Sequence, residues 1–222
     1  MPAQEKYIKF ITLLKRVSEE SPRNGSFWSA FEKLDELDVE QISILSAAAP
    51  RRLGRSQPVL TEEEQNYLSD LHGSLLTANI GFLGRFLLVL CIKDADSLKE
   101  IITRGGDDEQ AAAIMALNLR DDREVYVDNV VHACRTNSPI VFSAAAHDNP
   151  YAAKYFNDQE FKQLTIKTIF MGLDFDRIDG LEGRFNGDLG KSLTDFFEER
   201  QAAGRWLPDS VLEFMKRKGL LE

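Results

Sequence analysis

Apolar residues recur at the three-and-four spacing of an α-helix along nearly the whole chain, and no segment keeps a strict alternation of apolar and polar residues. This periodicity constrains the fold most, because a helix buries one face at that spacing whereas a half-buried strand buries every second residue. The sequence therefore predicts an all-α protein. Helical faces are expected at Tyr7–Val17, Phe27–Leu37, Glu63–Leu71, Phe82–Leu90, Asp107–Leu119, Val127–Cys134, Phe161–Met171, Leu189–Phe197 and Val211–Met215.

The breaks between these faces are short Gly, Pro, Asn and Ser corners, such as SPRNGS, RGGDD and HDNP. From about Ser97 onward a helix follows roughly every 15 to 25 residues, which is the rhythm of stacked antiparallel helix pairs. We expect an irregular α-solenoid-like array of antiparallel helices in the HEAT or armadillo manner, without a clean repeat consensus. The expected organisation is a single all-helical domain (1–222) with an N-terminal helical subregion (1–57), a helical array (58–222) and PRRLGRSQP as the hinge.

Composition excludes several classes of function. The net charge is −9 and no basic run is present, so the chain is expected not to bind nucleic acid, whose phosphates repel it. Cys91 and Cys134 form no CxxC pair, which favours a reducing compartment and a cytoplasmic location. The most apolar segment, Ile80–Ile92, is shorter than the roughly 20 residues of a spanning helix and contains Arg85, so we expect a buried core helix and no membrane span.

No segment carries a complete catalytic, cofactor-binding or metal-binding motif. GRFNGDLGKS (183–192) ends like a phosphate-binding loop, but Phe185 stands where the first glycine belongs and no apolar strand precedes it. LDFDRIDG (173–180) is similar to a calcium loop, but its third acid is one residue late and its twelfth position is not Glu. The three histidines lack the spacing of a zinc site. We therefore predict no catalytic residue, cofactor or metal from motifs.

The segment HDNPYAAKYF (147–156) is the most polar and aromatic corner of the chain. Proline favours the first turn of a helix and disfavours helical backbone in the residue before it, so a helix is expected to end near Ala146 and another to begin at Pro150. Asp148 or Asn149 can cap the second helix. Capping does not account for His147 or for the tyrosine hydroxyls. These groups remain candidate ligand contacts, because ligand contacts concentrate at corners.

Arginines are spread among acids in the last third of the chain, at Arg177, Arg184, Arg200 and Arg205, and Arg135 lies one corner upstream. Two interpretations stay open. Most exposed charges form solvated ion pairs on helix surfaces. Alternatively, a few of these guanidinium groups line a groove and hold an anion or carboxylate through paired hydrogen bonds.

An ordered series of phrases over residues 120–208 resembles the EboA-like family: HACRTNSPIVFSAAAHDNPYAAKYF, then LTIKTIFMGLDFDRIDGL, then ERQAAGRWLP. Ala152 departs from the pattern, because a second proline is expected after the tyrosine. The residues that carry the resemblance are Arg135, Asn137, Asn149, Pro150, Tyr151, Lys167, Phe170, Gly180, Leu181, Arg184, Asn186, Glu199, Arg200, Ala203, Gly204 and Arg205.

The resemblance implies a context rather than a chemistry. EboA-like proteins belong to a bacterial gene cluster for making and exporting secondary metabolites, which also encodes a UbiA-like membrane prenyltransferase. It implies a non-catalytic accessory protein that binds a partner enzyme or a metabolite, with the prenyltransferase as candidate partner and an indirect contact with the inner membrane. The alternative is an enzyme or ligand pocket at the corner formed by 135–151 and 184–205. Candidate ligand or partner contacts are Arg135, Asn137, His147, Asn149, Tyr151, Arg184, Asn186, Arg200 and Arg205.

Overall fold

A computed structural model describes residues 3–34 and 39–222, and within these ranges the chain consists of helices and turns, with an isolated antiparallel bridge between His147 and Ile178. The all-α prediction is confirmed, whereas the irregular α-solenoid-like, HEAT- or armadillo-like array of antiparallel helices stays a prediction. The α-helices are α1 (Ala3–Val17), α2 (Asn24–Phe31), α3 (Val39–Leu53), α4 (Glu62–Leu71), α5 (Ile80–Leu90), α6 (Ala95–Arg104), α7 (Asp107–Ala116), α8 (Val127–Ala133), α9 (Pro139–Ala146), α10 (Pro150–Tyr155), α11 (Asp158–Phe170), α12 (Leu181–Arg184), α13 (Gly187–Ala202) and α14 (Asp209–Arg217).

Short 3-10 helices join several of these elements: η2 (Gly73–Thr77), η3 (Leu117–Leu119), η4 (Arg123–Tyr126) and η5 (Phe175–Arg177). The segment REVYVDN, which alternates in sequence, is η4 followed by the start of α8. Of the expected Phe27–Leu37 face, α2 extends to Phe31, and Leu37 lies outside the described residues. The other expected faces each coincide with a helix.

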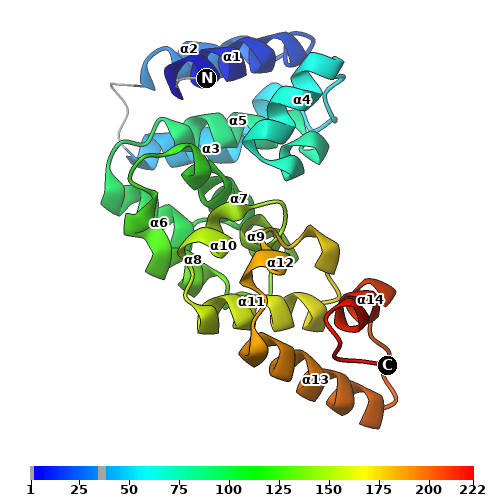
Figure 1. Ribbon diagram of the computed structural model, residues 1–222. Coiled ribbons are helices and arrows are strands. Elements are labelled where there is room, and N and C mark those ends of the chain that lie inside the picture. The colour runs from blue at the N-terminus through cyan, green and yellow to red at the C-terminus, as the bar shows by residue number, and fades with distance from the viewer. Residues whose placement is uncertain (1–2, 35–38) are drawn as a thin grey trace.

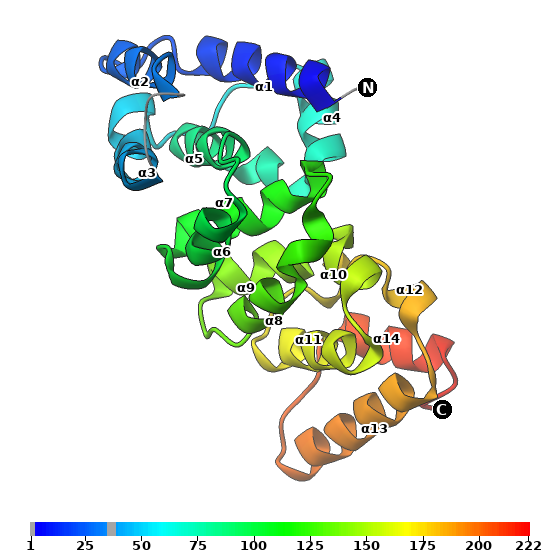
Figure 2. The ribbon, with the colours of Figure 1, turned by 90° about the vertical axis from the view of Figure 1, so that its left-hand side faces the viewer.

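The helices are stacked along one long axis, broadly from the N-terminus to the C-terminus, with α14 turning back beside α11 (Figures 1 and 2). The blue helices α1 and α2 form one end of the molecule, the green helices α6 to α9 its middle, and α13 and α14 the opposite end, so the two termini lie far apart. Buried apolar residues form one continuous core from Phe10 to Met215. The elongated stack therefore holds together through contacts between successive layers.

Helices α3 and α5 approach each other closely. A methyl group on Gly81 would lie 2.5 Å from the Cα of Pro50, so the two backbones meet at a position that only glycine fits. The first residues of the predicted hinge, PRRLGRSQP, are helical, because α3 continues through Pro50 to Leu53. Pro50 has no N–H to donate to the Ser46 carbonyl, which accepts a hydrogen bond from Nε of Arg85 at 3.2 Å instead.

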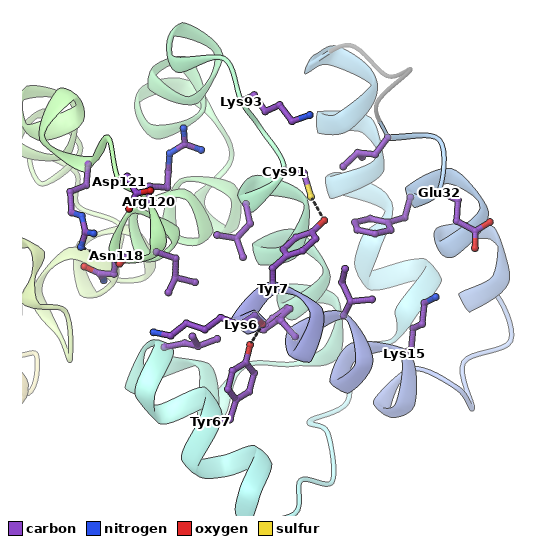
Figure 3. Close-up of a pocket in the computed structure, with 18 residues that line it drawn as sticks. Lys6, Tyr7, Lys15, Glu32, Tyr67, Cys91, Lys93, Asn118, Arg120 and Asp121 are labelled. Carbon is purple, nitrogen blue, oxygen red and sulfur yellow. Dashed lines mark hydrogen bonds between the residues drawn. The ribbon is translucent and has the colours of Figure 1, made fainter. Parts of the chain in front are cut away.

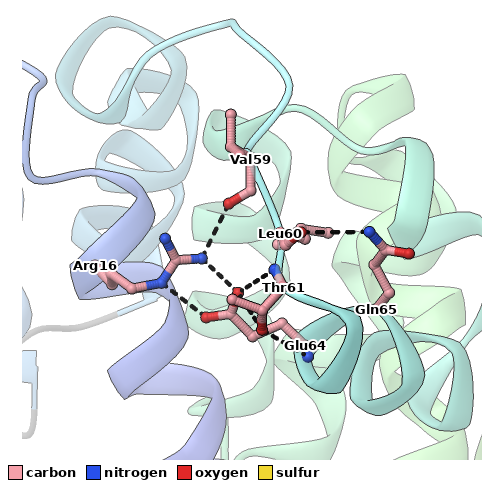
Figure 4. A network of polar contacts seen from close by, with 6 residues as sticks. All are labelled: Arg16, Val59, Leu60, Thr61, Glu64 and Gln65. Atoms are coloured by element: carbon pink, nitrogen blue, oxygen red, sulfur yellow. Dashed lines mark hydrogen bonds and ion pairs between the residues drawn. The ribbon is translucent and has the colours of Figure 1, made fainter.

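Helix α1 is fixed to α4 by polar contacts near its C-terminal end (Figure 4). Nε of Arg16 donates to Oε1 of Glu64 at 2.8 Å, and its Nη2 donates to the Val59 carbonyl at 3.0 Å. Glu64 also completes a capping box with Thr61, the N-cap of α4. Near the start of α1, the hydroxyl of Tyr67 donates to the backbone carbonyl of Lys6. These contacts hold α1 across α4 and α5 and so fix one wall of a cavity described below.

Candidate functional site

Asn149 occupies the corner that the sequence singled out, and the capping interpretation is confirmed there. Helix α9 ends at Ala146 and α10 begins at Pro150, with Asn149 as its N-cap. The Asn149 side chain is almost fully buried. Its Oδ1 accepts from the Tyr151 N–H at 2.9 Å and from Nδ2 of Asn118 at 2.8 Å, while its Nδ2 donates to the Ala144 carbonyl at 2.6 Å. All of its polar atoms therefore serve to join η3, α9 and α10.

His147 is buried beside a second buried histidine, His72. Burial lowers the pKa of His72 to about 4 and lowers the pKa of His147 from its usual value, so both rings are neutral at pH 7. The neighbouring Asp148 has a positive φ of 49° and forms an ion pair with Arg177, whose Nη2 also reaches Oγ of Ser74 at 3.1 Å. This cluster connects η2, the α9–α10 corner and η5.

Tyr151 and Arg184 bind opposite ends of the short helix α10 to its surroundings. The buried Tyr151 hydroxyl donates to the Arg123 carbonyl at 2.6 Å, and burial raises the pKa of this phenol. Arg184 donates to the carbonyls of Ala153 and Phe156, at 2.5 Å and 2.9 Å, and forms an ion pair with an aspartate of α11. Its guanidinium therefore has its main donors committed to the fold.

The remaining candidates lie on other elements. Asn186 caps α13 through the Leu189 N–H. Arg135 and Asn137 are exposed in the turn between α8 and α9, where Arg135 lines a cavity of about 360 Å³. Arg200 lies over the ring of Phe196, and the exposed Arg205 follows the end of α13, so neither contacts the corner in the hydrogen bonds and ring contacts of the described residues.

The structure therefore brings His147, Asn149 and Tyr151 together at one corner, with Arg184 at the far end of α10. Within residues 3–34 and 39–222, no group of three or more His, Cys, Asp or Glu side chains is arranged to hold a metal ion. The phosphate-loop-like segment is α12 followed by the start of α13, and the calcium-loop-like segment is built around η5.

The largest described cavity lies elsewhere, at the N-terminal end between α1, α2, α4, the end of α5 and residues 118–123 (Figure 3). We call it the N-terminal cavity; its volume is about 860 Å³. Its apolar wall consists of one face of α1 together with one or two residues from each of the other elements. These apolar and aromatic residues are Tyr7, Phe10, Ile11, Phe31, Leu34, Tyr67, Leu71, Leu90 and Leu119.

Charged side chains surround this apolar wall. Among the described lining residues five are basic and two are acidic: Lys6, Lys15, Lys93, Arg120 and Arg123 against Glu32 and Asp121. Figure 3 shows Lys6 extending toward the side on which Asn118, Arg120 and Asp121 lie, with Lys15 and Glu32 on the other side.

Arg120 is held rigidly at the rim of the N-terminal cavity. Its Nη1 donates to the Ile92 carbonyl at 2.7 Å, and its Nε and Nη2 donate to the two carboxylate oxygens of Asp122 at 2.8 Å and 2.9 Å. Hydrogen bonds from Arg120 lower the pKa of Asp122 to about 2. Inside the cavity, the Tyr7 hydroxyl lies 3.0 Å from Sγ of Cys91 and links α1 to the end of α5.

Sequence reasoning missed this cavity because no local motif marks it. Its lining residues are spread from Lys6 to Arg123, and each helix contributes only a few of them. Every apolar member occupies a helical face that is equally consistent with an ordinary core. The available signal was the position of Lys6 and Lys15, which lie at the two ends of the apolar face of α1.

Comparison with protein families matches residues 29–216 to the family described as metabolite traffic protein EboA. Neither curated proteins nor solved structures gave a match. In the described residues, no helix combines the length and apolar character needed to cross a membrane. The matched range covers most of the chain and includes the α9–α10 corner. The chain therefore belongs to the EboA family of metabolite traffic proteins.

Proposed function

We propose that this protein is a non-catalytic accessory protein that binds a small metabolite in the N-terminal cavity. The observation that supports the proposal most is the cavity itself, with a volume of about 860 Å³ and a largely apolar wall. Ligand sites in proteins typically measure about 300–1,000 Å³ and combine apolar walls with a few polar groups. A binding role also agrees with the traffic role in the family's description.

The polar groups of the cavity favour binding over catalysis, because several of them already have structural partners. The Tyr67 hydroxyl donates to the backbone of α1, and burial raises the pKa of its phenol, so it stays neutral at pH 7. Arg120 is bonded to Ile92 and Asp122. A general acid or base needs a pKa near the working pH, and these two groups do not have one.

Retention of a metabolite tests the proposal. The protein is purified from a host that expresses the gene cluster and is weighed by native mass spectrometry, where we expect a bound small mass. Ile11→Trp fills the cavity and should abolish that mass. Ile8→Trp is the matched control, since Ile8 lies on the same helix with 57% of its surface exposed and does not line the cavity. Equal retention by both variants, or no bound mass on the wild type, would refute the proposal.

Delivery of a metabolite requires a partner, and a second surface supports partner docking. Trp206 is 89% exposed after α13, beside a cavity of about 390 Å³ lined by Phe197, Leu212 and Leu221. Exposed apolar patches of this kind often mark interaction surfaces. The proposed partner is the UbiA-like membrane prenyltransferase of the cluster, which would place a cytoplasmic protein at the inner membrane.

Co-purification with the co-expressed prenyltransferase tests this second part. Trp206→Ala should reduce capture, whereas Phe170→Ala should not, because Phe170 is also exposed but lies on α11 away from that cavity. Undiminished capture by Trp206→Ala would remove this surface from the proposal.

The alternative remains an enzyme or ligand pocket at the corner of 135–151 and 184–205. It requires that His147 and Arg184 leave their present surroundings, because His147 is buried and Arg184 is bonded to two carbonyls. Alanine at either position should then abolish product formation in a host while the protein stays folded. Normal product formation by both folded variants would exclude the corner pocket.

A further inference from the structure

The N-terminal cavity has a charge that is opposite to that of the whole protein. The chain carries a net charge of −9. The described lining residues nevertheless include five basic and two acidic side chains. Solvated surface charges distributed at random would follow the net charge, so the basic excess at this cavity is a local feature that needs its own explanation.

The basic groups are distributed unevenly around the cavity. Lys6, Arg120 and Arg123 line one end together with residues 118–121, of which Asp121 is acidic, and Figure 3 shows Lys6 directed to that side. On the opposite side Lys15 is accompanied by Glu32, and the two charges offset one another. One end of the cavity is therefore cationic, and the apolar wall lies next to it.

Two cations at this end have donors left for a ligand. Lys6 is half-buried, and its ammonium group forms no ion pair with any described residue, whereas Lys9 on the same helix pairs with Glu63 at 2.8 Å. Arg123 donates to the Asn118 carbonyl at 3.3 Å through one of its five N–H groups. Arg120 donates to both carboxylate oxygens of Asp122 and to the Ile92 carbonyl, so its charge is paired within the fold and it is left out of the ligand contacts.

The backbone holds Lys6 in a position to reach a ligand. Its carbonyl accepts the hydrogen bond from Tyr67, which fixes this turn of α1 against α4. Next to it, Tyr7 and Phe10 provide aromatic surface, and Ile11 continues the same face into the cavity. A ligand that spans both regions needs an anionic group at one end and an apolar or aromatic body at the other.

We infer that the N-terminal cavity binds an amphipathic anion, whose carboxylate or other oxyanion contacts Lys6 and Arg123 and whose apolar body packs on Tyr7, Phe10 and Ile11. This assignment rests on the proposed function, since it names the chemical class of the ligand. Charge-assisted hydrogen bonds from Lys and Arg to an oxyanion are the stronger class of hydrogen bond and set the orientation of the ligand.

Three probes with one alkyl chain and different head groups test the assignment by calorimetric titration of the full chain: decanoate, decanol and decyltrimethylammonium, each below its micelle concentration. Decanoate should bind about tenfold more tightly than decanol, and the cation more weakly than either. Its affinity should fall as salt is added, while that of decanol should not.

Matched lysine variants locate the anion. Lys6→Gln should weaken decanoate binding about tenfold and leave decanol unchanged. Lys9→Gln removes an equal charge from the same helix but does not line the cavity, and should leave both probes unchanged. Circular dichroism and unfolding midpoints show that the variants are folded. Equal losses in Lys6→Gln and Lys9→Gln would overturn the assignment, because the effect would then be general electrostatics.

The outcomes separate this assignment from the proposed function. If decanol binds as well as decanoate and Ile11→Trp abolishes both, the cavity binds apolar ligands and only the anion assignment is wrong. If no probe binds, or if Ile11→Trp and Ile8→Trp bind alike, the cavity is not a ligand site and both statements fail.

Discussion

Replacing Asn149 by alanine should destabilise the protein far more than the loss of a helix cap. Asn149 is 1% exposed and satisfies three partners at once. It accepts from the Tyr151 N–H at 2.9 Å and from Nδ2 of Asn118 at 2.8 Å, and it donates to the Ala144 carbonyl at 2.6 Å. Alanine removes all three hydrogen bonds and creates a small buried space.

The magnitude follows from what is left unpaired. Loss of an Asn N-cap costs about 1 kcal/mol. A buried acceptor without a partner costs about 1–3 kcal/mol, and Asn149→Ala removes the donor to the Ala144 carbonyl, whereas the half-buried Asn118 keeps the Met115 carbonyl at 3.5 Å. We therefore expect a loss of about 2–4 kcal/mol in the free energy of unfolding. Asn149→Asp keeps the two acceptor contacts but sets a carboxylate against the Ala144 carbonyl, so it should also destabilise.

Asn157 provides the matched control, because it is also an Asn N-cap but is exposed, at the start of α11. Asn157→Ala should cost only about 1 kcal/mol. Both variants are compared with the wild type by urea unfolding followed by circular dichroism, at one pH and with the slope of the transition checked for change. If Asn149→Ala costs no more than Asn157→Ala, the buried network contributes nothing beyond the cap and our account of the corner is wrong.

Three further predictions concern pH, helix contact and the link between corner and cavity. Burial lowers the pKa of His72 in the folded protein from 6.5 to about 4. As the pH falls, the unfolded state therefore binds this proton first, and about 3 kcal/mol of stability should be lost between pH 6.5 and about pH 4. Urea unfolding of His72→Asn should show a flatter pH dependence than that of the wild type. Gly81→Ala should destabilise the protein by about 3 kcal/mol, because its methyl group meets the backbone of α3. Gly84→Ala should cost only about 1 kcal/mol, because its methyl group meets the end of a leucine side chain. Unfolding midpoints measure both losses. Tyr151→Phe removes the hydroxyl that donates to the Arg123 carbonyl at 2.6 Å and should lower the free energy of unfolding by about 1 kcal/mol. It should also weaken decanoate binding without affecting decanol binding. Unchanged decanoate affinity would contradict the link between corner and cavity.

Features with a local cause could be predicted from the sequence. The start of α4 follows from Thr61 and Glu64, three residues apart, and the start of α10 from Asn149 and Pro150. In each case the partner atoms lie within one turn of the chain, so the pattern of residues contains the interaction.

Features that depend on distant partners could not be predicted. Helix α3 continues through Pro50 because Arg85 supplies a donor to the Ser46 carbonyl, and nothing near Pro50 indicates this. Arg184 was a candidate for anion binding, but its shortest hydrogen bonds go to carbonyls of α10 and of the residue after it, which only the fold brings to it. A long cationic side chain is compatible with either role until its partners are known.

The corner and the N-terminal cavity are parts of one unit, although the sequence separates them. Asn118 and Arg123 line the cavity, and both are also bonded to the corner, Asn118 through Asn149 and Arg123 through the Tyr151 hydroxyl. The polar residues of the corner therefore determine where the cationic end of the cavity lies without contacting a ligand there. A shift of residues 118–123 would therefore move the groups that we expect to hold the anion.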